Sequence, residues 1–142
     1  MYSKILAPID GSDNSIRALR HGLFLSSKLG SKLTVLNVLE IPPVVYVQSQ
    51  KVVDSVNNSL ENESKKVFER ADTESQEYSV NFEPVLVKGH HVASTINEYA
   101  DQHGIDVIII GSRGHGKIKT TIMGSVAHNV FHHTKKPVLI IK

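Results

Sequence analysis

A short apolar run in the second half of the chain most constrains its fold. Asp106 to Ile110 reads Asp-Val-Ile-Ile-Ile, so four aliphatic residues follow one another without interruption by a polar residue, and Gly111 ends the run. A run without alternation is typical of a strand buried on both faces, as in a parallel sheet covered by helices. A basic loop follows, and Gly124-Ser125 then suits the start of a helix. The segment predicts a central strand that leads through a loop to a helix N-terminus.

The rest of the chain repeats this alternation of strand and helix. The other strands are expected at Lys4–Ile9, Leu33–Leu39, Val80–Lys88 and Pro137–Ile141, and the helices at Ile16–Leu29, Val52–Tyr78, Val92–His103 and Ser125–His133. Ser12 or Asp13 is suited to cap the first helix, and Gly30 to end it with a left-handed backbone. Pro84 inside the third strand indicates a sheet edge. The order predicts an α/β fold with helices on both faces of a parallel sheet.

Composition excludes several classes of protein. The chain has 142 residues, which suits a single domain over 1–142. It has no cysteine, so disulfides, thiol catalysis and thiolate metal sites are excluded. A formal charge of +2 is too small to indicate a nucleic-acid partner. No apolar run approaches the ~20 residues of a membrane span, and the N-terminal run is too short for a signal peptide, so we expect a soluble cytoplasmic protein.

The loop after Gly111 has the features of a phosphate-binding site. Gly111, Gly114 and Gly124 would let the backbone approach a phosphate closely and adopt positive φ. The N–H groups of Ser125 and Val126 would lie unpaired at a helix start, where the helix dipole favours an anion. Four basic side chains make the loop electropositive: Arg113, His115, Lys117 and Lys119. The alternative is that the glycines serve tight turns and the cations are solvated.

A second motif overlaps this loop. Residues 111–117 match the first part of a P-loop, G-x4-G-K. Ile118 follows where Ser or Thr would hold Mg²⁺, and the expected helix begins only at Ser125. These two departures disfavour a P-loop nucleotide hydrolase.

Three segments together resemble the universal stress protein family. They are Pro8-Ile9-Asp10-Gly11-Ser12, the pattern Gly111-x2-Gly114-x9-Gly124-Ser125, and Lys136-Pro137-Val138-Leu139-Ile140-Ile141. The resemblance covers essentially the whole length. It implies that Asp10 helps hold the adenosine side of a nucleotide, that Pro8 and Ile9 help line the pocket, and that the backbone at Val38 meets the adenine edge. The alternatives are that Asp10 caps the first helix and that Val38 is an ordinary core residue, which it can be simultaneously.

The resemblance also implies an assembly and a set of ligands. The family pairs its last strand with that of a second subunit, so we expect a homodimer through residues 137–141. An apolar edge strand needs such cover; the alternative is that the chain's own helices shield it. The ligand would be ATP, or AMP or ADP, with a Mg or Mn ion held mainly by the phosphates. Where the family often has Gly-Asp after the third strand, this chain has Gly89-His90-His91.

The eight histidines do not form a recognisable metal motif. His90-His91 and His132-His133 are adjacent pairs, and adjacent residues on a helix do not face the same way. His128 and His132 are four residues apart and could share a face, but no further ligand pattern accompanies them. We therefore predict no metal site built by protein ligands. No pair of catalytic carboxylates or nucleophile with a base stands out, so we assign no catalytic residue.

These observations predict a Rossmann-like fold of the adenine nucleotide alpha hydrolase-like type. Its five-stranded parallel sheet would have the order 3-2-1-4-5. The predicted function is adenine-nucleotide binding, with ATP as the ligand, in a stress-response or signalling protein. Two alternatives stay open: a slow ATPase or phosphotransferase, and a dimeric interaction module that binds no nucleotide.

Overall fold

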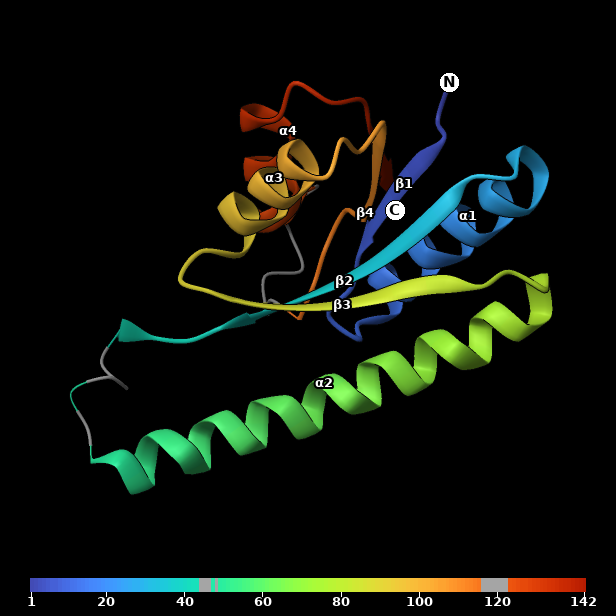
Figure 1. Ribbon diagram of the computed structural model, residues 1–142. Coiled ribbons are helices and arrows are strands. Elements are labelled where there is room, and N and C mark those ends of the chain that lie inside the picture. The colour runs from blue at the N-terminus through green and yellow to red at the C-terminus, as the bar shows by residue number, and fades with distance from the viewer. Residues whose placement is uncertain (44–46, 48, 116–122) are drawn as a thin grey trace.

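A computed structural model describes residues 1–43, 47, 49–115 and 123–142. Within these residues, five strands and four helices alternate (Figure 1). The strands are β1 (Lys4–Pro8), β2 (Lys32–Glu40), β3 (Phe82–Gly89), β4 (Val107–Gly111) and β5 (Val138–Ile141). The helices are α1 (Asp13–Leu29), α2 (Gln50–Tyr78), α3 (Val92–Gln102) and α4 (Ser125–His133).

The strands form one parallel sheet in the order β3-β2-β1-β4-β5. This confirms the predicted fold class and strand order, and Pro84 lies on an edge strand, β3, as expected. β3 begins at Phe82 and not at Val80, because Ser79 has a left-handed φ of 54° and the Val80 N–H bonds to the Ser75 carbonyl. These residues therefore end α2 and do not extend the sheet.

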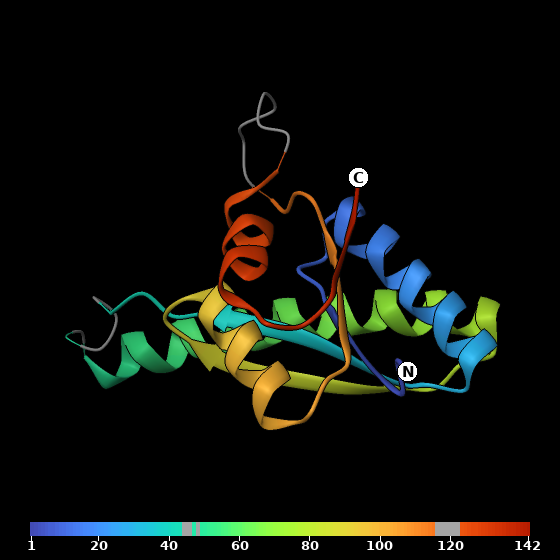
Figure 2. The ribbon, with the colours of Figure 1, turned by 90° about the horizontal axis from the view of Figure 1, so that it is seen from above.

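Two helices cover each face of the sheet. α1 and α2 pack on one face, where the core includes Ile16, Leu19 and Leu23 of α1. α3 and α4 pack on the other, with Ile96 and Val130 in the core. Figure 2 shows α1 on one side of β1 and β4, with α3 and α4 on the other. The central strands β1 and β4 are consequently buried on both faces, as the run of aliphatic residues predicts.

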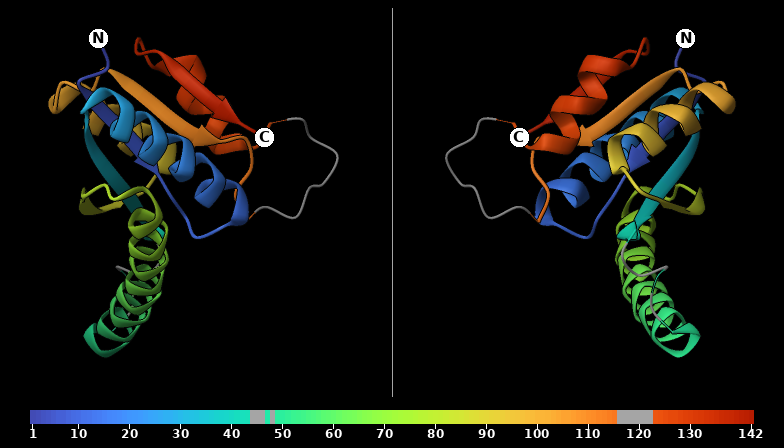
Figure 3. Two further views of the ribbon diagram at one scale, coloured as in Figure 1. Left: turned by 90° about the vertical axis from the view of Figure 1, so that its right-hand side faces the viewer. Right: turned by 90° about the vertical axis from the view of Figure 1, so that its left-hand side faces the viewer.

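α1 and α2 differ in how completely they are packed. The Ser12 side chain caps α1, and Gly30 ends it with a φ of 67°, as the sequence predicts. The buried residues of α2 lie at its midpoint and toward its C-terminal end: Ser64, Ala71 and Glu74. Figure 3 shows α2 extending away from the other helices. No helix in the described part of the chain is both long and apolar enough to cross a bilayer.

Candidate functional site

A cavity of about 210 Å³ lies at the carboxyl ends of the central strands, where parallel sheets bind their ligands. All the residues that the sequence predicted for a nucleotide line this one cavity. They are Pro8, Ile9, Asp10, Val38, Gly111, Arg113, Gly114, Gly124, Ser125 and Val126. They come from the ends of β1, β2 and β4 and from the first turn of α4. The topology therefore brings the end of β1 and the end of β2 together with the β4–α4 segment, although these three parts of the chain are far apart in the sequence.

His115 of the basic loop also lines the cavity. Further lining residues were not assigned to the site by the sequence analysis: Ser15, Leu36, Val92, Ile96, Ile110, Ser112 and Ala127. Leu36 could have been found, because it lies two residues before Val38 on β2 and shares its face of the sheet. Val92 and Ile96 belong to α3, and no sequence signal places α3 beside β2 and α4. Six of the lining side chains make the inner wall apolar: Leu36, Val38, Val92, Ile96, Ile110 and Ala127.

Asp10 follows β1 and is held in a turn before α1. Its Oδ1 accepts hydrogen bonds from the backbone N–H and the hydroxyl of Ser12, at 2.9 and 2.5 Å. The Ser12 hydroxyl oxygen in turn accepts from the N–H of Ser15 and so caps α1. Asp10 therefore supports the cap without capping the helix itself. Its second oxygen, Oδ2, faces Gly114.

The glycines of the loop are needed for space. A Cβ at Gly111 would lie 2.8 Å from the backbone carbonyl carbon and oxygen of Asn14, at the start of α1. A Cβ at Gly114 would collide with Asp10 Oδ2, and one at Gly124 would lie 3.3 Å from the Ser112 carbonyl oxygen. None of the three has a positive φ, so that part of the sequence prediction is wrong. Close packing excludes a side chain at Gly111, against the α1 backbone, and at Gly114, against the Asp10 carboxylate, whereas a Cβ at Gly124 would only be tight; no left-handed conformation is involved.

The first turn of α4 has free hydrogen-bond donors. Gly124 occupies the N-cap position and provides no side-chain acceptor. The Gly124 N–H itself is used, because it donates to the Ser112 carbonyl at 2.6 Å. Ser125 and Val126 line the cavity from the first turn of the helix, and no capping side chain accepts from their N–H groups. Arg113 also lines it, and its guanidinium has no ion-pair partner among the described residues.

Two contacts hold the site's strand ends in place. The Asn37 side chain donates from Nδ2 to the Ile9 carbonyl at 2.7 Å, and its Oδ1 accepts from the Ser64 hydroxyl at 2.7 Å. All three groups are buried, so α2 is tied through β2 to the end of β1. On the loop side, a ring nitrogen of His115, Nε2, lies 2.7 Å from the Asp10 carbonyl oxygen. The two contacts fix the backbone on either side of Asp10.

Charge near the α1 start comes from an ion pair outside the cavity. Arg70 of α2 donates to the Gly11 carbonyl at 2.8 Å and to Asp13 Oδ1 at 2.7 Å. The hydrogen bond and charge of Arg70 lower the pKa of the exposed Asp13 carboxyl. Lys117, Lys119 and the end of the P-loop-like stretch, from residue 116 onward, lie outside the described residues. Among the residues that are described, no group of three or more potential ligands could hold a metal ion.

The universal stress protein family model matches residues 1–142. The chain belongs to this family. Universal stress protein YxiE of Bacillus subtilis is 31% identical over 150 residues, covering 100% of both chains. The solved structure of protein MJ0577, from Methanocaldococcus jannaschii, shares 30% sequence identity with a TM-score of 0.86 and covers 100% of this chain and 96% of its own. The resemblance predicted from the three sequence segments is thus confirmed.

Two more distant structural relatives in the family were solved with nucleotides. A universal stress protein from Archaeoglobus fulgidus is described in complex with dAMP; it is 22% identical, has a TM-score of 0.72 and covers 99% of this chain and 98% of its own. Another universal stress protein is described in complex with cAMP, at 22% identity and a TM-score of 0.72, covering 99% of this chain and 97% of its own. At this identity both establish the shared fold, and their ligands are properties of those two proteins.

Proposed function

We propose that this universal stress protein binds an adenine nucleotide, ATP, in the cavity at the ends of β1 and β4. The observation that carries the proposal is the junction of an apolar pocket with the uncapped start of α4. The apolar wall suits a flat base, and the free N–H groups of Ser125 and Val126 suit phosphate oxygens. That two relatives were solved with dAMP and cAMP is consistent with an adenine nucleotide.

The register of β2 supports a role for the Val38 backbone. The Leu36 carbonyl accepts from the Ile9 N–H, so the backbone groups of Leu36 point toward β1. Val38 lies two residues further on and directs its N–H and C=O to the same side. β1 has ended there, because its last paired residue is Pro8, opposite Leu36. The Val38 backbone therefore has no strand partner on that side, and we assign it to the edge of the adenine.

The remaining roles follow from position. Asp10 Oδ2, on the rim, would accept from ribose hydroxyls, with Pro8 and Ile9 beneath the nucleoside. Gly111, Gly114 and Gly124 let the loop pack closely against α1, Asp10 and Ser112 beside the phosphates, and Arg113 supplies a positive charge there. A Mg or Mn ion would be held mainly by the phosphates. In this proposal the protein acts in the cytoplasm as a stress-response protein whose nucleotide occupancy is its signal.

The first test is a spectrum of freshly purified protein, followed by chromatography of the compound that denaturation releases. The chain has no Trp and 4 Tyr, so a bound adenine would dominate the absorbance near 260 nm, a wavelength set by the base and not by the protein. Protein that is purified empty should melt at a higher temperature when Mg·ATP is added, because a ligand of the native state stabilises it. If neither bound nucleotide nor a shift is found, the proposal is wrong.

A pair of variants at Gly124 tests where the phosphates bind. Gly124→Asp places a carboxylate where the phosphates would bind, and we expect it to raise the Kd for ATP more than tenfold, about 1.4 kcal/mol. Gly124→Ala adds only a methyl group, 3.3 Å from the Ser112 carbonyl, and should cost less affinity. Equal affinities in Gly124→Asp and the wild type would show that the phosphates bind elsewhere.

A slow ATPase is the second candidate, favoured by the carboxylate of Asp10 beside the glycine loop. A hydrolase would release ADP over several turnovers, and Asp10→Asn would abolish that release while Ser12 could still donate to the new amide oxygen. If the protein releases no more ADP than the nucleotide it held at the start, it does not turn over, and nucleotide binding remains the proposed function.

We also propose a homodimer through residues 137–141. β5 is an edge strand, and its Leu139 is 39% exposed. A second copy pairing along β5 would cover this edge. Light scattering should give twice the chain mass, and Ile140→Pro, which removes a backbone donor from the strand, should reduce it. A wild-type monomer at high concentration would contradict the dimer, leaving the edge strand exposed.

A further inference from the structure

The histidines of this chain fall into two groups by the partners of their rings. In one group a ring nitrogen lies within hydrogen-bonding distance of a backbone carbonyl oxygen. These are His90 with Ile41, His103 with Tyr99, His115 with Asp10 and His133 with Asn129. A ring held in this way has one nitrogen occupied and one orientation fixed. The second group contains a pair on α4 with a different arrangement.

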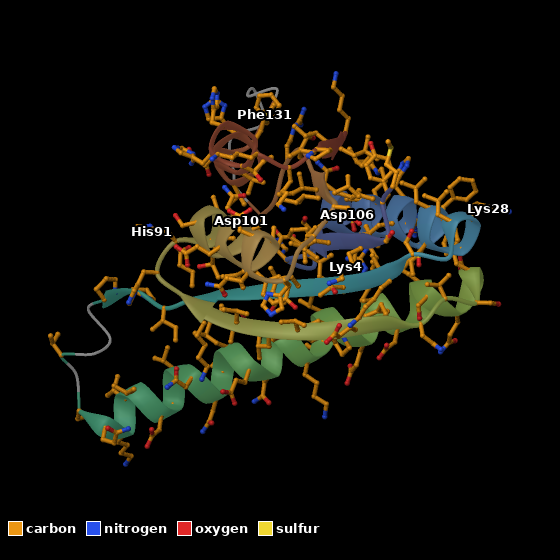
Figure 4. The ribbon with its side chains drawn as sticks, turned by 45° about the horizontal axis from the view of Figure 1, so that its top comes forward. Lys4, Lys28, His91, Asp101, Asp106 and Phe131 are labelled. Carbon is orange, nitrogen blue, oxygen red and sulfur yellow. The ribbon has the colours of Figure 1, made fainter. Side chains whose placement is uncertain are left out.

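His128 and His132 stand one turn apart on the exposed side of α4. Their ring centroids are 4.3 Å apart and the rings are tilted by 57°. Among the described residues neither ring has a hydrogen-bond or ion-pair partner, and both residues are exposed. Phe131 lies against the edge of the His132 ring, with centroids 5.7 Å apart, and Figure 4 shows it on the outer side of α4. The two imidazoles lie close together at a tilt, and within the described part of the chain their nitrogens have no partner.

We propose that His128 and His132 form a surface site for a borderline transition-metal ion, in the affinity order Cu²⁺ above Ni²⁺ and Zn²⁺. Two neutral imidazoles at i and i+4 can direct one nitrogen each toward an ion at about 2.0–2.1 Å, as paired histidines on zinc-binding helices do. Imidazole nitrogen suits these ions, whereas Mg²⁺ prefers oxygen. Water would complete the coordination, because both residues face solvent.

The position on the helix favours a cation. His132 lies in the last turn of α4, where the helix dipole is negative. Lys135 and Lys136 follow the helix and oppose a further positive charge, so two imidazoles and water should give an exchangeable site and not a permanent one. The sequence analysis predicted no metal site because no third ligand accompanies the pair. The structure adds the closeness of the two rings and, among the described residues, the lack of partners for their nitrogens, which spacing alone does not establish.

An ion bound by His128 and His132 would cross-link two successive turns of α4. α4 has 9 residues, and its first turn carries Ser125 and Val126 of the cavity. Chelation would therefore stabilise the helix that presents free N–H groups to the cavity. The metal site does not depend on nucleotide binding, since no lining residue of the cavity is a ligand.

The test is calorimetric titration of the tag-free protein with CuCl2, NiCl2 or ZnCl2, with MgCl2 as the control ion. We expect one transition-metal ion per chain, reversed by EDTA, and no heat from MgCl2. His128→Ala and His132→Ala should each raise the Kd for Ni²⁺ by roughly tenfold or more. Loss of a residue that only hydrogen-bonds to a metal ligand already weakens metal binding by about that much, and loss of the ligand itself should weaken it at least as much. Both residues are exposed, so neither variant should change the fold, which the unfolding midpoint without metal checks.

His133→Ala is the matched control. His133 is adjacent to His132 and also exposed, but its Nδ1 lies 2.9 Å from the Asn129 carbonyl oxygen. This variant should bind Ni²⁺ as the wild type does. The proposal is overturned if His128→Ala and His132→Ala bind as tightly as the wild type, or if His133→Ala loses as much affinity as they do. One ion per two chains would also contradict a site made by a single chain.

Discussion

Two helices begin beside the cavity, and they begin in different ways. α1 has its first turn satisfied from within the chain: the Ser12 hydroxyl caps it, and Asp10 accepts two hydrogen bonds from Ser12. α4 begins at Gly124 with no side-chain cap and no acidic residue in its first turn. Both starts lie at the same edge of the sheet, so the difference is one of sequence and not of position.

The contrast separates a structural helix start from one that can serve a ligand. Orphan N–H groups at a helix N-terminus cost free energy unless an acceptor reaches them, and an N-cap side chain contributes about 1 kcal/mol. At α1 the chain supplies that acceptor. At α4 the chain supplies no acceptor, although a capping side chain at position 124 would be enough to provide one. The unmet donors of α4 line the cavity, where we propose that phosphate oxygens are the acceptors.

Gly111→Ala should have the largest effect, and it tests the α1 side of the comparison. The new methyl group would lie 2.8 Å from the backbone of Asn14, so α1 must shift relative to β4. We expect a loss of about 3 kcal/mol in the free energy of unfolding, at the upper end of overpacking costs. Urea denaturation measures it, with Gly124→Ala as the control. A loss as large in the control would mean that the two helix starts are packed alike.

Exchanging two serines for alanine sharpens the comparison. Ser12→Ala removes the α1 cap and should cost about 1 kcal/mol of stability. Ser125→Ala removes a hydroxyl that caps nothing, so stability should change by less than about 0.5 kcal/mol. Affinity for ATP should fall in Ser125→Ala, because the hydroxyl can donate to a phosphate. Unfolding curves and nucleotide titrations on the same preparations measure both effects. If Ser125→Ala proved less stable than Ser12→Ala, the difference between the two helix starts would be contradicted.

Acid should weaken α1 through its contacts with α2. Arg20 donates to both carboxylate oxygens of Glu74, at 2.6 and 2.8 Å, and this hydrogen bonding lowers the pKa of Glu74 from its ordinary value. A lowered pKa in the folded state stabilises the protein above the ordinary pKa, and this contribution is lost as the pH falls through the lowered value. Arg20 is half exposed, so we expect Arg20→Ala to cost about 0.5–1 kcal/mol at neutral pH.

The pH dependence of that cost provides the check. The difference in unfolding free energy between Arg20→Ala and the wild type should be constant from pH 7 down to about 5 and then shrink. No ion pair joins α4 to its neighbours within the described residues, so α4 contributes no such acid-sensitive contact. A difference that stays constant down to pH 2 would show that Arg20 acts through packing and not through the charge of Glu74.

Much of the fold could be predicted because local signals agreed with each other. The run at β4 has no polar alternation, and Gly30 stands where α1 must turn left-handed. The position of α4, from Ser125 to His133, followed from Gly124-Ser125 and is confirmed. Element ends were less accurate where backbone bonding decides them, as at Ser79, because no residue type marks a turn of that kind uniquely.

The site could be predicted as far as single segments carry information. Asp10, Gly111 and Ser125 each follow a strand or open a helix, so sequence alone indicates their edge of the sheet. The contribution of α3 could not be predicted, since Val92 and Ile96 reach the cavity through packing against β2 and α4. The role of the glycines was also misjudged. Space beside Asn14 and Asp10 is a tertiary property, whereas positive φ is a guess from residue type.

Gly124→Asn should have the smallest effect on stability, and its sign decides the comparison. Position 124 has an extended backbone, φ −71° and ψ 162°, which suits an Asn N-cap. Its amide oxygen would accept from the first turn of α4, and stability should rise by a few tenths of a kcal/mol, about the difference between Asn and Gly as caps. The same oxygen would take donors that we assign to phosphate, so ATP should bind more weakly. A variant that gains stability while losing nucleotide would show that α4 keeps its start uncapped for the ligand. If both stability and affinity fell, the 3.3 Å approach to the Ser112 carbonyl would be the reason for glycine, and the contrast with α1 would be one of packing.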